Sequence, residues 1–255
     1  MRSALLFVAS FVFFSFGAAP GAAADLGNGV TASGGATLVS DYRIRGISQT
    51  DKRFALQGSV TLAHESGFYT SIWGSSIDDY VARESDVELD LIAGYRSTFG
   101  GTTVDAGVLY YYYPGSGGGN TDFVEPYVSV AHTLGPVTAK VTANYAPSQS
   151  ALSIGAGEED NLYLAGDLNA ALPATPITLS AHLGHSFGPS YLTIGDEYTD
   201  WSLGATYAVA RSRLASPTWT RTQRSSRRAA AMPARRACSP RLAWHFEESR
   251  NVEAS

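Results

Sequence analysis

Apolar and polar side chains alternate along most of this chain with a period of two residues. The clearest alternation lies between residues 85 and 96. There the apolar positions are Val87, Leu89, Leu91, Ala93 and Tyr95, and the polar positions are Asp86, Glu88, Asp90 and Arg96. Because successive side chains of a strand point to opposite faces, this segment predicts a β-strand with one apolar and one charged face.

Ten segments of this kind follow one another, and nowhere does a helical period persist over the length that an independent helix needs. We expect strands at residues 30–45, 54–65, 68–76, 85–96, 104–112, 124–130, 137–145, 162–169, 177–183 and 201–209. The segment 124–130 contains Pro126, which cannot donate a ladder hydrogen bond and therefore belongs at a bulge or at the rim of a sheet.

The connections between these segments alternate strictly in length. Short ones are expected at residues 65–67, 97–101, 133–136 and 171–176, and long ones at 46–53, 77–84, 114–121, 146–160 and 187–199. Outer-membrane barrels have short periplasmic turns and longer outer loops. Closure of the barrel also removes the sheet edges, whose backbone groups would have no hydrogen-bond partner in the hydrocarbon of the membrane. The pattern predicts an antiparallel transmembrane β-barrel with ten strands. A soluble β-sandwich or lipocalin-like barrel, which shares the alternation with inverted polarity, is the alternative.

The two parities of such a barrel have different roles. Aromatic residues on the apolar parity gather near strand ends, where they predict interfacial girdles: Tyr42, Phe54, Phe68, Tyr95, Tyr110, Tyr112, Tyr145, Trp201 and Tyr207. Charged residues on the polar parity are expected to line the lumen: Arg43, Arg45, Asp86, Glu88, Asp90, Asp105, Lys140 and Asp167. Rings of charge in a narrow aqueous path select ions by sign, but in a small barrel inward charges also pair with one another and fill the interior.

The first 24 residues have the features of a secretory signal peptide. Arg2 precedes an apolar stretch from Ala4 to Phe16, and the small residues 22–24 predict cleavage between Ala24 and Asp25. The stretch is shorter than the roughly 20 apolar residues that span a bilayer. Cys238 is the only cysteine, which excludes an internal disulfide and a cysteine-built metal site.

The sequence contains no recognisable signature of catalysis or metal binding. His182 and His185 have a spacing that places them on opposite faces of a strand, so we expect no metal site there. No helix is expected after the glycine-rich stretch 115–119, so it predicts a flexible loop rather than a phosphate site. The acidic stretches 158–160 and 196–197 are read as solvated loop charges, with binding of divalent cations as the alternative. We therefore expect no enzyme activity and no cofactor.

The stretch from Ser40 to Asp51, with the sequence SDYRIRGISQTD, resembles the opening signature of the TorF porin family of proteobacteria. The likeness continues through HESGFY at 64–69, WGS at 73–75, ELD at 88–90 and GY at 94–95, and covers about residues 30–210. The resemblance implies an outer-membrane barrel. Family members continue with a further hairpin, about twelve strands in all, and end on a strand with a terminal aromatic residue that resembles the signal read by the barrel-assembly machinery.

The chain departs from that pattern near Ala210. Residues 25–210 contain seven basic and twenty acidic residues, a net charge of −13, whereas residues 211–255 contain ten arginines and three glutamates, a net charge of +7. Residues 216–221 can be written in codons that, read one nucleotide earlier, encode the alternating strand Val-Ser-Tyr-Val-Asp-Thr. We therefore expect residues 211–255 to be an out-of-frame, disordered basic tail. A basic arm that binds nucleic acid or anionic lipid is the alternative; because its arginines are not interleaved with aromatic residues, we expect no nucleic-acid partner.

These observations lead to an expectation for function. The chain is expected to be exported to the outer membrane of a Gram-negative bacterium and to permit passive diffusion of small hydrophilic solutes or ions through a charged lumen. Its expected partners are outer-membrane lipid, the barrel-assembly machinery and the solutes. The alternatives are a non-conducting structural or adhesive barrel and a soluble periplasmic β-barrel carrier.

Overall fold

The computed structural model describes residues 23–117 and 120–208, which form one antiparallel sheet of eleven strands and a separate two-stranded hairpin. The protein is therefore all-β over this range, apart from one short 3₁₀ turn. No helix in the described part of the chain is long and apolar enough to cross a membrane. Most of the predicted signal peptide and the whole predicted basic tail lie outside the described residues.

The elements follow one another in sequence order. They are β1 (Ala23–Gly27), β2 (Val30–Val39), β3 (Arg43–Ile44), β4 (Ile47–Ser48), β5 (Ala55–His64), β6 (Phe68–Ser76), β7 (Val87–Phe99), β8 (Thr102–Tyr112), β9 (Phe123–Leu134), β10 (Val137–Ile154), β11 (Gly157–Ala171), β12 (Ile177–Phe187), η1 (Tyr191–Thr193) and β13 (Tyr198–Tyr207). The main sheet has the order β1-β2-β5-β6-β7-β8-β9-β10-β11-β12-β13, so each strand pairs with its neighbours in the chain, with β3 and β4 set aside.

The ten predicted strands correspond to β2 and β5 through β13, with two corrections to their limits. The first strand was expected to reach residue 45, but β2 ends at Val39 and the following residues leave the sheet. The long loop expected at 146–160 is wrong: β10 and β11 continue through it and meet at Ile154 and Gly157. Register shifts after Ala146 and Gln149 accommodate this extension. The pairing of β9 with β10 ends at Tyr127, next to Pro126, which is consistent with a proline that cannot donate.

The sheet exposes its apolar side chains and buries its charged ones, which is the reverse of the usual arrangement in a soluble protein. Large apolar side chains such as Leu56, Val141 and Leu203 are exposed, the last at 71 %. Charged side chains on the other parity, including Glu88 and Glu125, are fully buried. Soluble domains bury apolar side chains and almost never fully bury Glu or Asp unless the charge is paired. The alternation of the sequence is thus realised as an exposed apolar face and a buried polar face.

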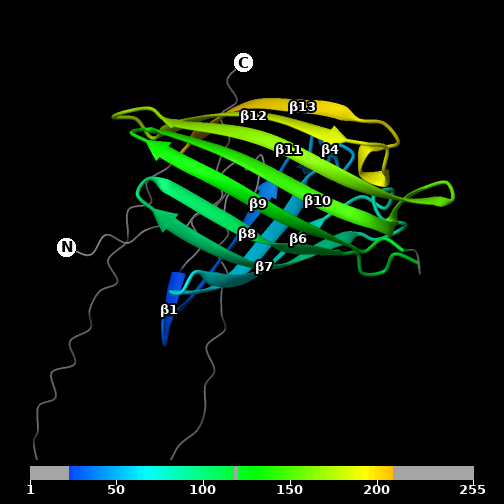
Figure 1. Ribbon diagram of the computed structural model, residues 1–255, viewed down its shortest axis with the longest axis horizontal. Coiled ribbons are helices and arrows are strands. Elements are labelled where there is room, and N and C mark those ends of the chain that lie inside the picture. Colours follow the sequence, from blue (N-terminus) through cyan, green and yellow to red (C-terminus); the bar gives the residue numbers. More distant parts are fainter. Residues whose placement is uncertain (1–22, 118–119, 209–255) are drawn as a thin grey trace, which may run out of the picture. The chain divides into compact units, whose positions relative to one another are not determined.

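The sheet is curved (Figure 1), and side chains of the polar face meet across its concave side. Tyr69 on β6 and Tyr127 on β9 form a hydrogen bond between their hydroxyls although β7 and β8 separate their strands. The Tyr69 hydroxyl also donates to Asp105 on β8 at 2.8 Å. The sheet is not closed by backbone pairing among the described residues, because β1 and β13 form its two edges. The closed barrel expected from the sequence is therefore not observed.

Candidate functional site

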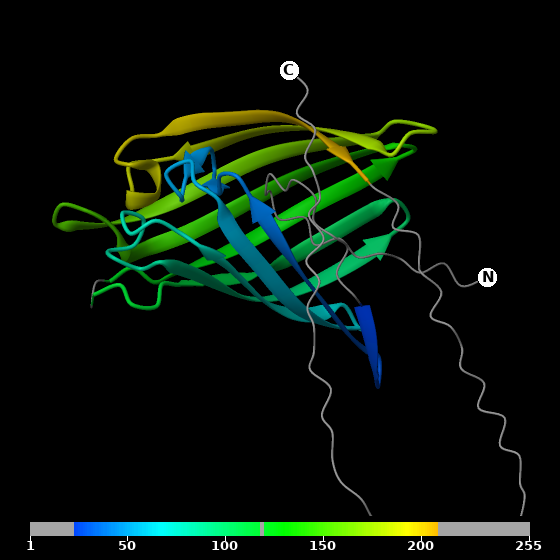
Figure 2. The same cartoon turned by 180° about the vertical axis from the view of Figure 1, so that it is seen from behind.

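The segment between β2 and β5 forms a hairpin at the concave face of the sheet. β3 and β4 are joined by a two-residue turn at Arg45 and Gly46, where φ is +47° and +80°. Two central residues with positive φ are typical of the type I′ turn that favours hairpins. Figure 2 shows the hairpin in blue at the same end of the sheet as the yellow η1 segment. This hairpin, residues 40–53, was not expected from the sequence.

Hydrogen bonds within the hairpin give it a defined shape. The Asp41 carboxylate accepts from the Ser48 hydroxyl at 2.5 Å and from Arg43 Nε at 2.6 Å. Arg43 also donates to the carbonyl of Gly46 at 2.8 Å, and the Thr50 hydroxyl accepts from the backbone N–H of Tyr42 at 3.1 Å. The segment is thus an ordered unit held by its own side chains.

Arg45 projects from the turn into a cage of three sheet residues. Its guanidinium forms an ion pair with Glu125 on β9 and donates from Nη1 to Asn161 Oδ1 on β11 at 2.8 Å. The Cζ atom lies 4.4 Å from the centre of the Tyr163 ring, a cation–π contact. The Arg45 side chain is 10 % exposed and that of Glu125 is fully buried. Burial alone lowers the pKa of Arg45, but Glu125 together with Tyr111 and Tyr163 outweighs this effect and the pKa is raised, so the cation is retained.

Neighbouring strands orient the cage residues themselves. The second oxygen of Glu125 accepts from the Tyr111 hydroxyl at 3.2 Å and from Asn144 Nδ2 at 3.1 Å. Asn161 donates to the Ser186 hydroxyl at 3.1 Å and to the backbone of β12. Every polar group of the Glu125 carboxylate is therefore satisfied, as a buried charge requires.

Tyr42 is the second anchor of the hairpin, and its predicted place in a lipid-facing girdle is wrong. Its side chain is 1 % exposed, donates from its hydroxyl to Glu88 on β7 at 2.6 Å and has its ring centre 5.3 Å from that of Trp73. Burial and the nearby Glu88 carboxylate raise the pKa of Tyr42, so its hydroxyl remains a donor. The error arises because the chain leaves the sheet at Val39, which ends the alternation on which the prediction depended.

The other predicted girdle residues lie exposed on the apolar parity. They are Phe54, Phe68, Tyr95, Tyr110, Tyr112, Tyr145, Trp201 and Tyr207, with exposures from 37 % to 72 %.

Six of the eight residues predicted to line a lumen lie at the polar face. Glu88 and Asp90 on β7 and Asp105 on β8 are buried there, and Lys140 and Asp167 are cross-strand neighbours. Arg45 reaches the face from the hairpin. Arg43 remains 43 % exposed beside Asp41, and Asp86 is exposed just before β7, so these two are not part of the buried face.

A second group on the polar face was missed by the prediction. His182 on β12 lies between two carboxylates, with Nδ1 2.7 Å from Asp167 and Nε2 3.1 Å from Asp200. The Tyr163 hydroxyl lies 2.9 Å from His182 and donates to Asp200 at 3.0 Å. The sequence did indicate that His182 belongs to the polar face, since His182, like Asp167, is on the polar parity of its strand. As expected, His185 lies on the opposite parity and contacts Thr199 instead.

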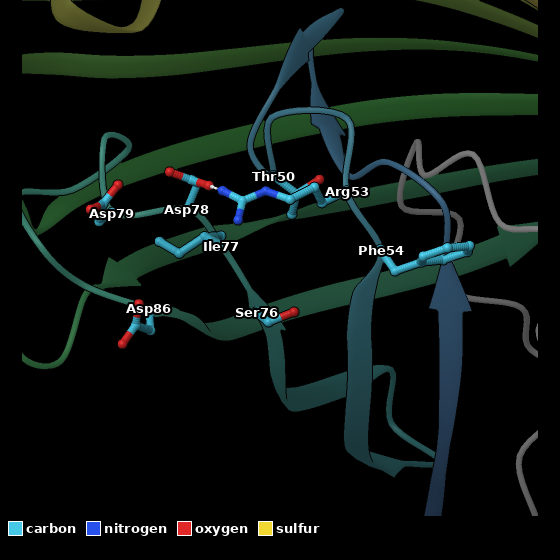
Figure 3. A pocket seen from close by; sticks show the side chains of 8 residues that line it. All are labelled: Thr50, Arg53, Phe54, Ser76, Ile77, Asp78, Asp79 and Asp86. Atoms are coloured by element: carbon cyan, nitrogen blue, oxygen red, sulfur yellow. Dashed lines mark ion pairs between the residues drawn. The ribbon is translucent and has the colours of Figure 1, made fainter.

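An open pocket of about 350 Å³ lies where β5 begins, β6 ends and β7 begins. Figure 3 shows Arg53 and Asp78 pointing toward one another, with Asp79 and Asp86 nearby and the Phe54 ring turned away. Most of the Arg53 side chain is exposed, and an exposed ion pair contributes little to stability. In the described part of the chain, no three His, Cys, Asp or Glu side chains are placed to hold a metal ion.

Fold and site together define an all-β protein whose curved sheet exposes apolar side chains and buries charged ones beneath an inserted hairpin. The chain belongs to the family described as bacterial protein of unknown function (Gcw_chp), whose model matches residues 23–242. The match includes every described strand and extends beyond Tyr207, the last residue of β13. No curated protein and no solved structure gives a significant match to the chain.

Proposed function

We propose that this chain forms an outer-membrane β-barrel channel for passive diffusion of small hydrophilic solutes. The observation that carries the proposal is the inverted polarity of the sheet. Leu56, Val141 and Leu203 represent an exposed apolar face that only a lipid environment removes from water, while Glu88 and Glu125 are turned to the interior. Strands of outer-membrane barrels alternate apolar outside and polar inside in this way.

Closure of the sheet is part of the proposal. The edges β1 and β13 carry backbone groups that would cost several kcal/mol each if left unpaired in hydrocarbon, so a membrane-inserted form requires them to be paired. The resemblance of residues 40–51 and of later motifs to the TorF porin family supports the same assignment. In this proposal lipid and the barrel-assembly machinery are the partners, and the outer membrane of a Gram-negative bacterium is the location.

The charge of the polar face favours cations. Its carboxylates are Glu88, Asp90, Asp105, Glu125, Asp167 and Asp200, and its basic side chains are Arg45, Arg96 and Lys140. His182 pairs with the carboxylates of both Asp167 and Asp200 and counts as positive, so six formal negative and four positive charges leave a formal net charge of −2. An excess of one sign along a narrow aqueous path selects ions of the opposite sign.

A non-conducting structural barrel is the second candidate, and a specific observation favours it. Several interior charges are paired: Arg45 with Glu125, and Arg96 with Asp105 at 2.5 Å. Glu88 and Glu125 are fully buried beneath the hairpin, so solvent does not reach them in this conformation. Ions could therefore reach these two carboxylates only if the hairpin moved, whereas a structural barrel needs no such movement.

Recordings from planar bilayers test the channel directly. The purified chain should give discrete conductance steps, and its reversal potential in a KCl gradient should indicate a preference for K⁺. Asp167→Asn should reduce that preference, because it removes a carboxylate from the polar face, while the loop variant Glu197→Gln should leave it unchanged. A chain that inserts into membranes but neither conducts nor admits small sugars in liposome swelling would support the structural barrel instead. Recovery in the soluble fraction would contradict both.

A further inference from the structure

Arg45 occupies a cage whose chemistry matches a guanidinium group on three sides. A carboxylate from Glu125, an amide oxygen from Asn161 and the aromatic face of Tyr163 surround it. The guanidinium group is planar, offers five N–H donors in a fixed fork and stacks on aromatic rings. We propose that this cage is a recognition site for small guanidinium-type cations, which Arg45 fills from within the chain. The inference rests on the proposed channel and names a class of solute for it.

The cage belongs to the sheet and not to the hairpin. Glu125 is held by Tyr111 on β8 and Asn144 on β10, at 3.2 and 3.1 Å. Asn161 is fixed by Ser186 on β12. Tyr163 is likewise held through its hydroxyl by Asp200 and His182, outside the three groups that face Arg45. All three walls therefore keep their orientation without Arg45, which is the preorganisation that a binding site needs.

The guanidinium that fills the cage comes from a separate unit. The hairpin keeps its shape through bonds among Asp41, Arg43 and Ser48, while Tyr42 anchors its base to Glu88, so displacement of Arg45 frees the turn and not the whole segment. Arg45 has φ of +47° because it is the first central residue of the two-residue turn between β3 and β4. The turn therefore presents the Arg45 side chain to the cage.

Competition follows from this arrangement. A free guanidinium-type cation that enters the cage takes the place of the Arg45 side chain and removes the contacts that hold the turn over Glu125. Because a ligand shifts an equilibrium by its differential affinity for the two states, such a cation favours the conformation in which the turn at Arg45 has withdrawn from the cage. Recognition of the solute and opening of the path would then be one event.

Chemical complementation tests the cage. Arg45→Ala should leave it empty, and methylguanidinium should bind to this variant in detergent and raise its melting temperature. Methylammonium has the same charge but lacks the planar group that donates to Glu125 and Asn161 while it stacks on Tyr163, so it should bind at least about tenfold more weakly. In the double variant Arg45→Ala with Glu125→Gln, methylguanidinium binding should fall by a similar factor. If Arg45→Ala does not fold, Arg45→Gly serves as the host, because glycine also leaves the cage empty and readily adopts the positive φ of this turn position.

The outcomes separate this inference from the channel itself. Equal binding of the two cations, or binding that is unaffected by Glu125→Gln, would overturn the guanidinium site even if the chain conducts. Selective binding to Arg45→Ala supports it, and so does an increased open fraction of the wild-type chain in methylguanidinium but not in methylammonium. If the chain binds methylguanidinium selectively but conducts under no condition, the guanidinium site is supported and the proposed channel is contradicted.

Discussion

At the scale of single residues, the ion pair of Arg45 with Glu125 is the most consequential contact in the structure. Both side chains are removed from water, and further hydrogen bonds satisfy the groups that the pair itself leaves free. A buried ion pair of this kind contributes little net free energy to stability, but loss of one partner leaves an uncompensated buried charge. The contact therefore fixes where the hairpin lies.

Removal of the Glu125 charge should destabilise the protein strongly. In Glu125→Gln the side chain keeps its shape while Arg45 loses its counter-charge, and the expected cost is about 3 kcal/mol of unfolding free energy. Urea titration of the refolded protein in detergent measures it. The matched variant Glu158→Gln changes an exposed glutamate and should shift the midpoint only slightly. Equal midpoints for the two variants would mean that the pair does not hold the hairpin.

The sequence predicted some of these residues and not others, for a local reason. The alternation correctly placed Glu88, Asp90 and Asp105 on the polar face, because a strand's parity is set by the residues within it. Tyr42 was assigned incorrectly because Tyr42 and Ile44 happen to continue the parity of β2 across the point where the backbone leaves the sheet. The Arg45–Gly46 pair, at which the turn forms, was the only local sign of a hairpin.

At the scale of elements, inward tyrosines lie over glycines on neighbouring strands. Tyr127 on β9 lies opposite Gly107 on β8, and a Cβ atom added at Gly107 would be 2.8 Å from the Tyr127 hydroxyl and 2.5 Å from the backbone oxygen of Ala93. Tyr69 on β6 lies in the same way over Gly94 on β7. These close approaches let the aromatic rings lie along the concave face.

A methyl group at Gly107 should therefore disturb the association of β7, β8 and β9. We expect Gly107→Ala to lower the unfolding free energy by about 1–3 kcal/mol, the usual cost of overpacking. Gly166→Ala on β11 is the matched control, because an added Cβ there meets no atom within 4 Å and φ is not positive. Thermal melts in detergent compare the two. A Gly166→Ala variant as unstable as Gly107→Ala would indicate a general loss of strand flexibility and not a specific clash.

The strands themselves were predictable because each of the ten carries its own alternation and its own turn signals. Their ends were not, since pairing continues wherever a partner strand is available. β10 and β11 extend through residues 146–160 because each strand supplies hydrogen bonds to the other, whereas the small and polar residues that are frequent there indicated a loop. The hairpin at 40–53 is the opposite case, in which contacts with strands distant in sequence draw a segment away from the sheet.

At the scale of the whole molecule, the account depends on the environment of the two faces of the sheet. Apolar side chains from Leu38 to Leu203 are exposed on one face, and the charges on the other are buried. The sequence predicted this division, but a closed barrel is not formed among the described residues. Closure depends on how the two edge strands are paired, and the alternation within each strand carries no information about that.

Fluorescent labels on three consecutive residues of β12 test most directly whether one face of the sheet contacts lipid and the other does not. Single cysteines replace Leu179, Ser180 or Ala181 in a Cys238→Ser background, and each labelled protein is inserted into vesicles that contain brominated lipid. The account predicts strong quenching by lipid at Leu179 and Ala181 and weak quenching at Ser180, whose side chain lies on the polar parity. Equal quenching of all three labels by an aqueous quencher, with no effect of brominated lipid, would contradict it.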